Sequence, residues 1–186
     1  VGWSLRPRVL EALRSGDAQR AIDILTHAMP ALHAAPDALI KIDAHGLLAL
    51  AQARAGYPAA ARASIERTNM LVEPRNPPVT YPRHLGLGAV AEAALLLLER
   101  ASDSGAPREE RRELSRIAAL ACHNLHRYRR VFRVGAPAAW RYQGWLYALS
   151  NRPRRASAAL EKSVSAAALL KMPEAEALAR SLLARY

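Results

Sequence analysis

The residues best suited to chemistry lie in one stretch, where Cys122, His123 and His126 come close together. Thiolates and imidazoles are common ligands of zinc, and a zinc site needs three or four ligands. Cys122 is the only cysteine of the chain, and no Asp or Glu lies between Glu113 and Glu161 to complete such a site. We therefore expect neither a metal ion nor a cofactor here.

The usual signatures of catalysis are also missing from the sequence. It has no glycine-rich phosphate loop and no Gly-x-Ser-x-Gly nucleophile sequence. Between residues 108 and 113, glutamates alternate with arginines, which favours a salt-bridged helix start over an acid–base pair. We expect no enzymatic activity in this chain, and the alternative is an enzyme built on a helical scaffold.

Arginine dominates the charge of the chain, whose formal net charge is +11 over 186 residues. Nine arginines lie between Glu113 and Glu161, with no acidic residue among them. They are Arg116, Arg127, Arg129, Arg130, Arg133, Arg141, Arg152, Arg154 and Arg155. This stretch is the strongest candidate for a binding surface.

Helical spacing divides the stretch 116–133 into two faces. One face carries apolar residues such as Leu120, Leu125 and Val131, and the other is basic. The basic face includes the candidate partner-binding residues Arg127, Arg130 and Arg133, together with Arg116, His123, His126 and Arg129. It is either a solvated surface or a binding site for an acidic protein, a nucleic acid or an anionic membrane surface.

Aromatic residues gather in the same region. They are Tyr128, Phe132, Trp140, Tyr142, Trp145 and Tyr147. Trp140, Gly144 and Tyr147 have i, i+4, i+7 spacing, which predicts that they pack in the core. Tyr142 and Trp145 are then the freer side chains, and beside Arg141 they are candidates to contact a partner or to stack on single-stranded bases.

A repeated spacing predicts the elements that position these residues. A residue that tolerates left-handed backbone is followed by a small residue five positions later and a large aliphatic residue nine positions later. The three copies are Gly16, Ala21 and Leu25; Gly56, Ala61 and Ile65; and Asn151, Ala156 and Leu160. Each copy predicts two helices packed closely across a tight turn, and one such hairpin cannot bury its apolar face alone.

Proline, glycine and capping residues predict where these helices end. With 51% hydrophobic and 5% aromatic residues, the composition favours helices over a sheet. We expect one domain over 1–186 with nine helices and no strand. It would comprise hairpins over 3–30, 37–72, 83–133 and 136–170, a proline-rich linker over 73–82 and a capping helix over 174–185. The second helix should end near Pro30, and the hinge of the third hairpin departs from the repeated spacing.

The last hairpin resembles a tetratricopeptide repeat. Trp140, Gly144, Tyr147, Ala156 and Leu160 fall on positions that this family fills with Trp, Gly, Tyr, Ala and a large apolar residue. Gln143 and Asn151 depart from the pattern, and the first two hairpins lack the leading Trp. The resemblance implies an α-α superhelix of stacked hairpins, and irregular or HEAT-like stacking is the alternative.

In tetratricopeptide proteins, the first helix of each hairpin lines a concave groove. Carried over by position, the resemblance implies groove-facing sites at Arg6 and Leu10, at Gly46, Leu50 and Arg54, and at Arg141 and Trp145. A groove of arginine and apolar side chains suits an acidic or amphipathic segment, because the guanidinium fork binds carboxylates. The candidate partner-binding residues therefore include Arg6, Arg54, Arg141, Tyr142 and Trp145.

The remaining signals concern the setting of the protein. No apolar run is long enough to span a membrane and no signal sequence opens the chain, so we expect a cytoplasmic location. Residues 170–180 are similar to the closing segment of large bacterial signalling proteins with cyclase, kinase or ATPase domains, and the start at Val1 suggests a piece of a longer chain. We expect an interaction scaffold that binds a protein or another domain of its own chain, and a nucleic-acid-binding helical repeat is the alternative.

Overall fold

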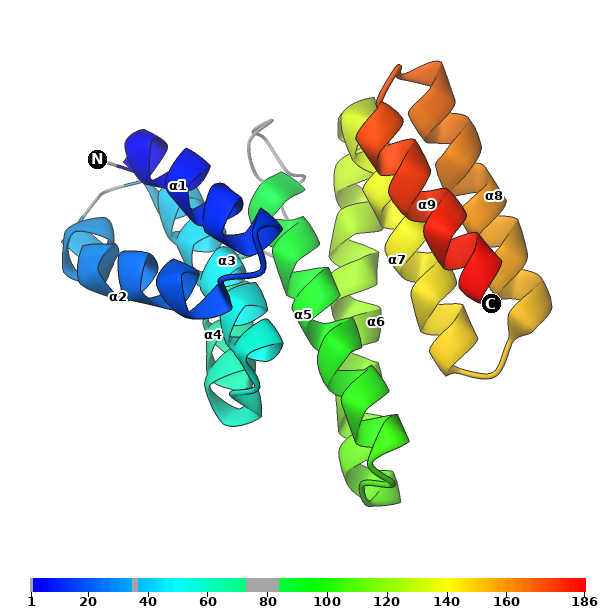
Figure 1. Ribbon diagram of the computed structural model, residues 1–186, viewed down its shortest axis with the longest axis horizontal. Helices are drawn as coiled ribbons and strands as arrows, with labels where there is room; N and C mark the ends of the chain where they lie inside the picture. The colour runs from blue at the N-terminus through cyan, green and yellow to red at the C-terminus, as the bar shows by residue number, and fades with distance from the viewer. Residues whose placement is uncertain (1, 35–36, 73–83) are drawn as a thin grey trace.

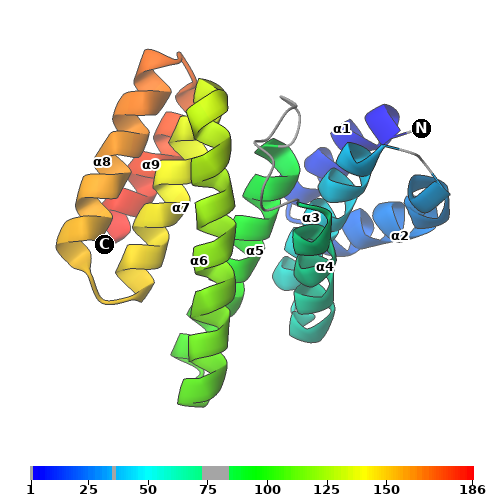
Figure 2. The same cartoon turned by 180° about the vertical axis from the view of Figure 1, so that it is seen from behind.

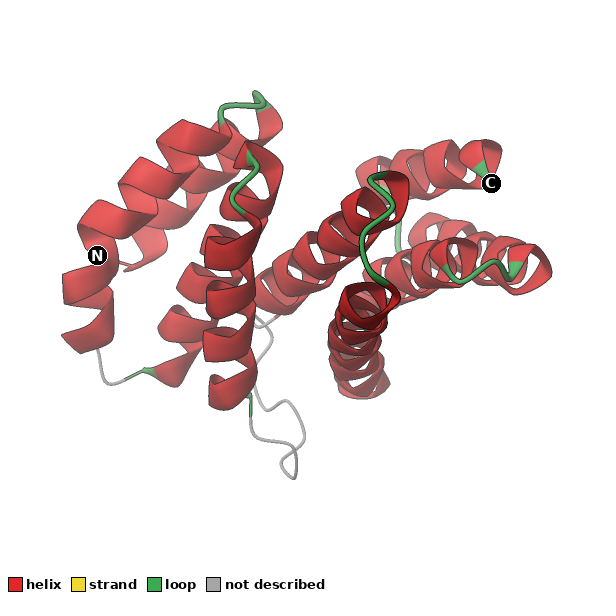
Figure 3. Cartoon of the chain, turned by 90° about the horizontal axis from the view of Figure 1, so that it is seen from below, coloured by secondary structure: helices red, strands yellow, loops and turns green. Residues whose placement is uncertain are grey.

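The computed structural model describes residues 2–34, 37–72 and 84–186. Within these ranges the chain forms nine α-helices, one 3₁₀ turn and no strand, which confirms the predicted all-α class (Figure 3). The helices are α1 (Gly2–Arg14), α2 (Ala18–Ala34), α3 (Ala38–Ala55), α4 (Pro58–Leu71), α5 (His84–Asp103), α6 (Arg108–Val131), α7 (Ala136–Leu149), α8 (Pro153–Leu169) and α9 (Pro173–Arg185), with the 3₁₀ turn η2 at Arg133–Gly135.

Five connections end the preceding helix in the same way. In each, one residue has a φ between +54° and +86°, and the next N–H donates to a carbonyl five positions earlier at 2.9 Å. These are the bonds of a Schellman helix end, which satisfies carbonyls that the helix leaves unpaired. The left-handed residues are Gly16, Gly56, Gly105, Asn151 and Lys171. The three predicted hinges are confirmed, and the α5–α6 and α8–α9 connections use the same turn.

The small and large positions of the three hinges are buried as the spacing predicts. The alanines Ala21, Ala61 and Ala156 have no exposed surface, and Leu25, Ile65 and Leu160 are at most 3% exposed. In the third hairpin, Leu114 keeps the buried large position. Glu110 replaces the small residue there and pairs with Arg62 of α4 at 2.7 Å. The departure of this hinge from the pattern therefore links two neighbouring hairpins.

The prediction that the second helix ends near Pro30 is wrong, because α2 continues to Ala34. A proline inside a helix removes one backbone hydrogen bond and is destabilising. Beyond the proline, however, Leu32 is buried and joins the hydrophobic core, and that burial offsets the lost bond. The predicted linker over 73–82 lies outside the described residues.

The helices form two rows (Figures 1 and 2). The odd-numbered helices make an inner row from α1 to α9, in which each helix contacts the next odd-numbered one. Each even-numbered helix packs behind this row, against the helices that precede and follow it in the chain. The inner row therefore brings side chains from helices far apart in sequence onto one surface.

The closest backbone approach within the inner row joins α3 to α5 at Gly46 and Gly86. A Cβ atom added to Gly86 would lie 2.7 Å from the carbonyl oxygen of Ile42, and one added to Gly46 would overlap the backbone of Gly86. Both positions therefore require glycine for packing, whatever their backbone angles. This contact sets how closely the first two hairpins pack against the third.

One apolar cluster runs from Val9 in α1 to Leu146 in α7 and includes residues from every helix between them. Because so many helices contribute to it, these elements form one body. Across the described ranges, no helix is long and apolar enough to cross a membrane.

Candidate partner-binding groove

A groove with a volume of about 700 Å³ lies along the inner row of helices. Its lining comes from the five odd-numbered helices and from the connections that lead into α7 and α9. Leu10, Leu50, Arg54 and Arg141, four of the residues predicted to face a groove, are among the lining residues. The apolar lining includes Leu10, Leu13, Leu47, Leu50, Leu85, Val134 and Leu178.

The polar lining is organised around Glu92 of α5. One carboxylate oxygen of Glu92 pairs with Arg54 Nη2 at 2.5 Å, and the other accepts a hydrogen bond from the Tyr142 hydroxyl at 2.8 Å. Arg141 Nη2 in turn donates to the Tyr142 oxygen at 2.8 Å. A single polar network therefore joins α3, α5 and α7 across the groove.

Burial fixes the protonation of this network. Tyr142 is 5% exposed, and burial raises the pKa of its hydroxyl, so the hydroxyl stays protonated and donates to Glu92. Arg54 also donates from Nη1 to the Leu13 carbonyl oxygen at 2.8 Å, which ties α3 to the end of α1. Arg54 and Arg141 are thus held in place by partners within the chain.

Sequence analysis missed Glu92, although a signal for it exists. Glu92 is the only charged residue between His84 and Glu99, and it shares a helical face with Leu85, Gly88 and Ala89. A lone carboxylate on an apolar helix needs a counter-charge, because an unpaired buried charge is costly. Here that counter-charge comes from Arg54.

An exposed ion pair bridges the two ends of the inner row. Arg14 Nη2 of α1 lies 3.5 Å from Glu174 Oε2 of α9, although the two residues are 160 positions apart in sequence. Both side chains are about 70% exposed, so solvent screens the pair and its contribution to stability is small. Its significance is geometric, since it places α1 and α9 on either side of the groove.

Arg6 does not line the groove, which corrects the sequence prediction. Its guanidinium pairs with Asp43 of α3, whose side chain is 8% exposed. Asp43 also accepts a hydrogen bond at 3.0 Å from the backbone N–H of Gly86, near the start of α5. Burial raises the pKa of Asp43, and the Arg6 guanidinium opposes this shift by favouring the carboxylate. Arg6 is therefore engaged by a buried carboxylate that needs a counter-ion.

The exposure of the aromatic residues of α7 is the opposite of the prediction, which placed Trp140 and Tyr147 in the core and left Tyr142 and Trp145 free. Tyr142 and Trp145, predicted to be free, are 5% and 8% exposed, whereas Trp140 and Tyr147 are only partly buried. The reason is that α7 packs against α5, α6, α8 and α9, so nearly all of its faces are covered. Trp145 is therefore a core residue and Tyr142 lines the groove from a buried position, so neither is free to stack on bases.

The remaining candidates, Arg127, Arg130 and Arg133, belong to α6 and η2 and do not line the groove. Arg130 and Arg133 are exposed, and Arg127 is half-buried and has a partner within the chain. The predicted apolar face of this helix is also incomplete, because Leu120 and Val131 are 47% and 51% exposed. The basic face and the groove are thus two separate surfaces.

The Cys122–His126 stretch has no arrangement suited to metal binding or thiol chemistry. Cys122 has no exposed surface, and burial raises the pKa of its thiol to about 12. His126 packs edge-on against Trp140, and burial, with nearby arginines and His123, lowers its pKa to about 4. Among the residues that the structure describes, no three His, Cys, Asp or Glu side chains are grouped closely enough to hold a metal ion.

Comparisons with protein-family models, with curated proteins and with solved structures each found no match to this chain.

Proposed function

We propose that this protein is an interaction scaffold that binds a peptide segment in the groove of its inner helices. The observation that supports this proposal is the lining itself, in which leucines from α1, α3, α5 and α9 surround a polar network at Glu92. Peptide segments that dock in helical grooves insert apolar side chains at helical spacing and fix their register with polar contacts. The proposed arrangement is a tetratricopeptide-like superhelix of stacked hairpins.

The charges of the groove define the chemistry of the segment. Arg14, Arg54 and Arg141 contribute three positive charges, and Glu92 and Glu174 contribute two negative ones, so the lining carries a small positive excess. We infer an amphipathic segment that places leucine-like side chains on the apolar lining and one or two carboxylates near Arg54 and Arg141. Glu92 competes with those carboxylates, so binding is moderate rather than driven by charge alone.

The segment is proposed to belong to another protein or to another domain of the same polypeptide. The similarity of residues 170–180 to the end of bacterial signalling proteins supports a role as a cytoplasmic regulatory module. In that role the groove would hold a segment in one signalling state and release it in another. Any catalytic activity would reside in other domains.

A substitution that introduces a negative charge into the groove tests whether the groove binds peptides. Peptides selected from a random 12-residue library on the full chain serve as probes, and their Kd is measured by fluorescence anisotropy. Leu178 lines the groove and is 48% exposed, so Leu178→Glu adds a repelling carboxylate there at little cost to folding. Leu169→Glu, at a residue that is 80% exposed and outside the groove, is the matched control.

We expect Leu178→Glu to weaken the selected acidic peptides by at least about tenfold, because it removes an apolar contact and adds like charge. Leu169→Glu should leave the Kd unchanged. Equal affinities for the wild-type chain and Leu178→Glu would overturn the groove assignment. A similar loss of peptide affinity in both variants would mean that net charge alone determines binding. That result would also overturn the groove assignment.

A further inference from the structure

The arginines of this protein fall into two groups according to their partners. Every ion pair among the described residues uses an arginine outside the interval 114–160, as in Arg62 with Glu110 and Arg185 with Glu99. Arg127 has a partner within the chain. None of the other eight arginines inside the interval pairs directly with a carboxylate of the described residues.

Two cations, one inside this interval and one just beyond it, contact the same indole ring. The guanidinium of Arg129 lies 4.4 Å from the centroid of Trp140, and Lys162 Nζ of α8 lies 4.8 Å from it. Arg129 Nε also donates to His126 Nδ1 at 2.7 Å, and the low pKa of His126 keeps that ring neutral. Trp140 therefore brings cations of α6 and α8 together at the back of α7, although like charges repel.

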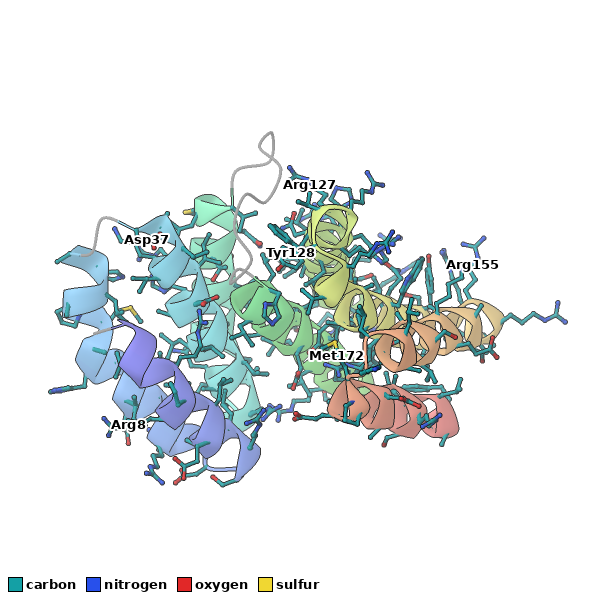
Figure 4. All side chains as sticks on the ribbon, turned by 90° about the horizontal axis from the view of Figure 1, so that it is seen from above. Arg8, Asp37, Arg127, Tyr128, Arg155 and Met172 are labelled. Atoms are coloured by element: carbon teal, nitrogen blue, oxygen red, sulfur yellow. The ribbon has the colours of Figure 1, made fainter. Side chains whose placement is uncertain are left out.

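Exposed basic residues continue from this point along both outer helices. They are Arg116 and Arg130 on α6 and Arg154, Arg155 and Lys162 on α8, and together we call them the outer basic stripe. α7, which has 14 residues and is therefore about 20 Å long, connects the end of α6 to the start of α8. Figure 4 shows Arg127 and Arg155 on the same side of the molecule, and Arg8 on the opposite side. The stripe thus extends over roughly the 20 Å length of α7, and none of its residues lines the groove.

The aromatic side chains near these cations indicate which kind of polyanion the outer basic stripe could bind. None of the six aromatic residues of α6 and α7 or their connection is exposed, and the ring of Trp140 is already covered by cations. Protein interfaces draw much of their affinity from Trp, Tyr and Arg side chains, and single-stranded nucleic acids from base stacking. Of these contacts the face offers only arginine, so it favours neither class of partner. Contacts with a duplex backbone need only cations, and a duplex presents a phosphate charge every 1.7 Å or so along its axis.

We propose that the outer basic stripe binds the phosphate backbone of double-stranded nucleic acid. We expect this binding to be independent of base sequence, because contacts to phosphates carry no sequence information. Arginine favours this role, since its planar fork donates two hydrogen bonds to one phosphate. The surface is separate from the peptide groove, so the two proposals succeed or fail independently.

The test measures binding of a fluorescein-labelled 20-base-pair DNA duplex to the full chain, by anisotropy, from 50 to 200 mM NaCl. The test variant, Arg130→Gln/Arg155→Gln, removes one exposed arginine from each outer helix. The control variant, Arg8→Gln/Arg20→Gln, removes two exposed arginines of α1 and α2 and changes the net charge by the same amount. A single strand of equal length and polyglutamate of equal charge are the comparison ligands.

We expect the test variant to bind the duplex about tenfold more weakly at 50 mM NaCl. Its slope of log Kd against log salt should fall by about 2, since each lost phosphate contact removes about 0.9. The control variant should match the wild-type chain in Kd and slope. Equal losses in the two variants, or no salt-dependent binding, would overturn the proposal. Tighter binding of the single strand, or polyglutamate binding that matches the duplex and has the same sensitivity to the test variant, would also overturn it.

Discussion

Glu92 engages two arginines of the groove from within the chain. Its carboxylate pairs with Arg54 and accepts from Tyr142, which in turn holds Arg141. A bound acidic side chain must compete with this internal carboxylate for the same donors. If the groove binds an acidic segment as proposed, we expect Glu92 to lower the affinity for it while it keeps Arg54 and Arg141 in defined positions.

Glu92→Gln should raise the affinity of the groove for acidic peptides and lower the stability of the protein. The substitution keeps the size of the side chain but raises the charge excess of the lining by one. We expect a Kd lower by a few fold at low salt, and unfolding in urea that is easier by about 1 kcal/mol, because the Arg54 pair is partly exposed.

The control for Glu92→Gln is Glu66→Gln, which makes the same charge change at an exposed position of α4 outside the groove. It should alter neither peptide affinity nor stability by a measurable amount. Weaker acidic-peptide binding by Glu92→Gln than by the wild-type chain would show that Glu92 helps to bind the segment and would contradict its competing role.

Helix packing at the scale of elements depends on a few small residues. The hinge alanines allow the two helices of a hairpin to approach, and Gly46 with Gly86 allows α3 to approach α5. Gly144 plays the same part between α7 and α8, since a Cβ there would lie 2.6 Å from Leu160 Cγ and 3.2 Å from the Ala156 carbonyl oxygen. This contact joins three of the positions on which the tetratricopeptide resemblance rests.

Two glycine substitutions on neighbouring helices should have opposite effects on stability. Gly46→Ala forces α3 and α5 apart, and we expect a loss of about 2–3 kcal/mol in the free energy of unfolding. Gly88→Ala places a Cβ at an ordinary 3.9 Å from Tyr142 Cε2, so better helix propensity should stabilise the protein by about 0.5–1 kcal/mol. Urea denaturation measures both, and a Gly46→Ala protein as stable as the wild-type chain would contradict the close α3–α5 contact.

At the scale of the whole molecule, the core decides how the chain unfolds. The apolar cluster passes from α1 to α7 without interruption, and α9 is tied back to α5 by Arg185 and Tyr186, which both contact Glu99. Cys122 lies within this cluster on α6 with no exposed surface. The hairpins should therefore unfold together rather than one at a time.

Three probes should report one unfolding transition. We expect far-ultraviolet circular dichroism, tryptophan fluorescence and the reaction of Cys122 with a thiol reagent to change at the same urea concentration. Burial raises the pKa of the Cys122 thiol to about 12, so the native thiol should react far more slowly than the unfolded one at pH 8. A loss of helix signal well before Cys122 becomes reactive would show that the hairpins unfold separately.

Local sequence patterns were enough to predict the helices, because the information they need lies within a few residues. Gly16, Gly56 and Asn151 take the left-handed angles that end their helices, and Asp37 caps α3 with a 2.8 Å bond from the Leu39 N–H. The continuation of α2 past Pro30 was not predicted, because the burial of Leu32 outweighs the local preference of proline. The left-handed Lys171 was not predicted either, because lysine carries no local signal for positive φ. The groove assignments of Leu10, Leu50, Arg54 and Arg141 came from the tetratricopeptide resemblance, and all four residues line the groove.

The sequence by itself determined the all-α class, the turns and the concentration of arginine, since composition, periodicity and charge are properties of the chain. Only the tertiary structure decided which charges meet. It paired Arg6 with Asp43 and Arg54 with Glu92, buried Tyr142 and Trp145, and left Arg130 of α6 and Arg155 of α8 exposed. The physical reason is that ion pairing and burial depend on distances between helices. The residues of these two ion pairs lie 37 and 38 positions apart in the chain, beyond the reach of any local pattern.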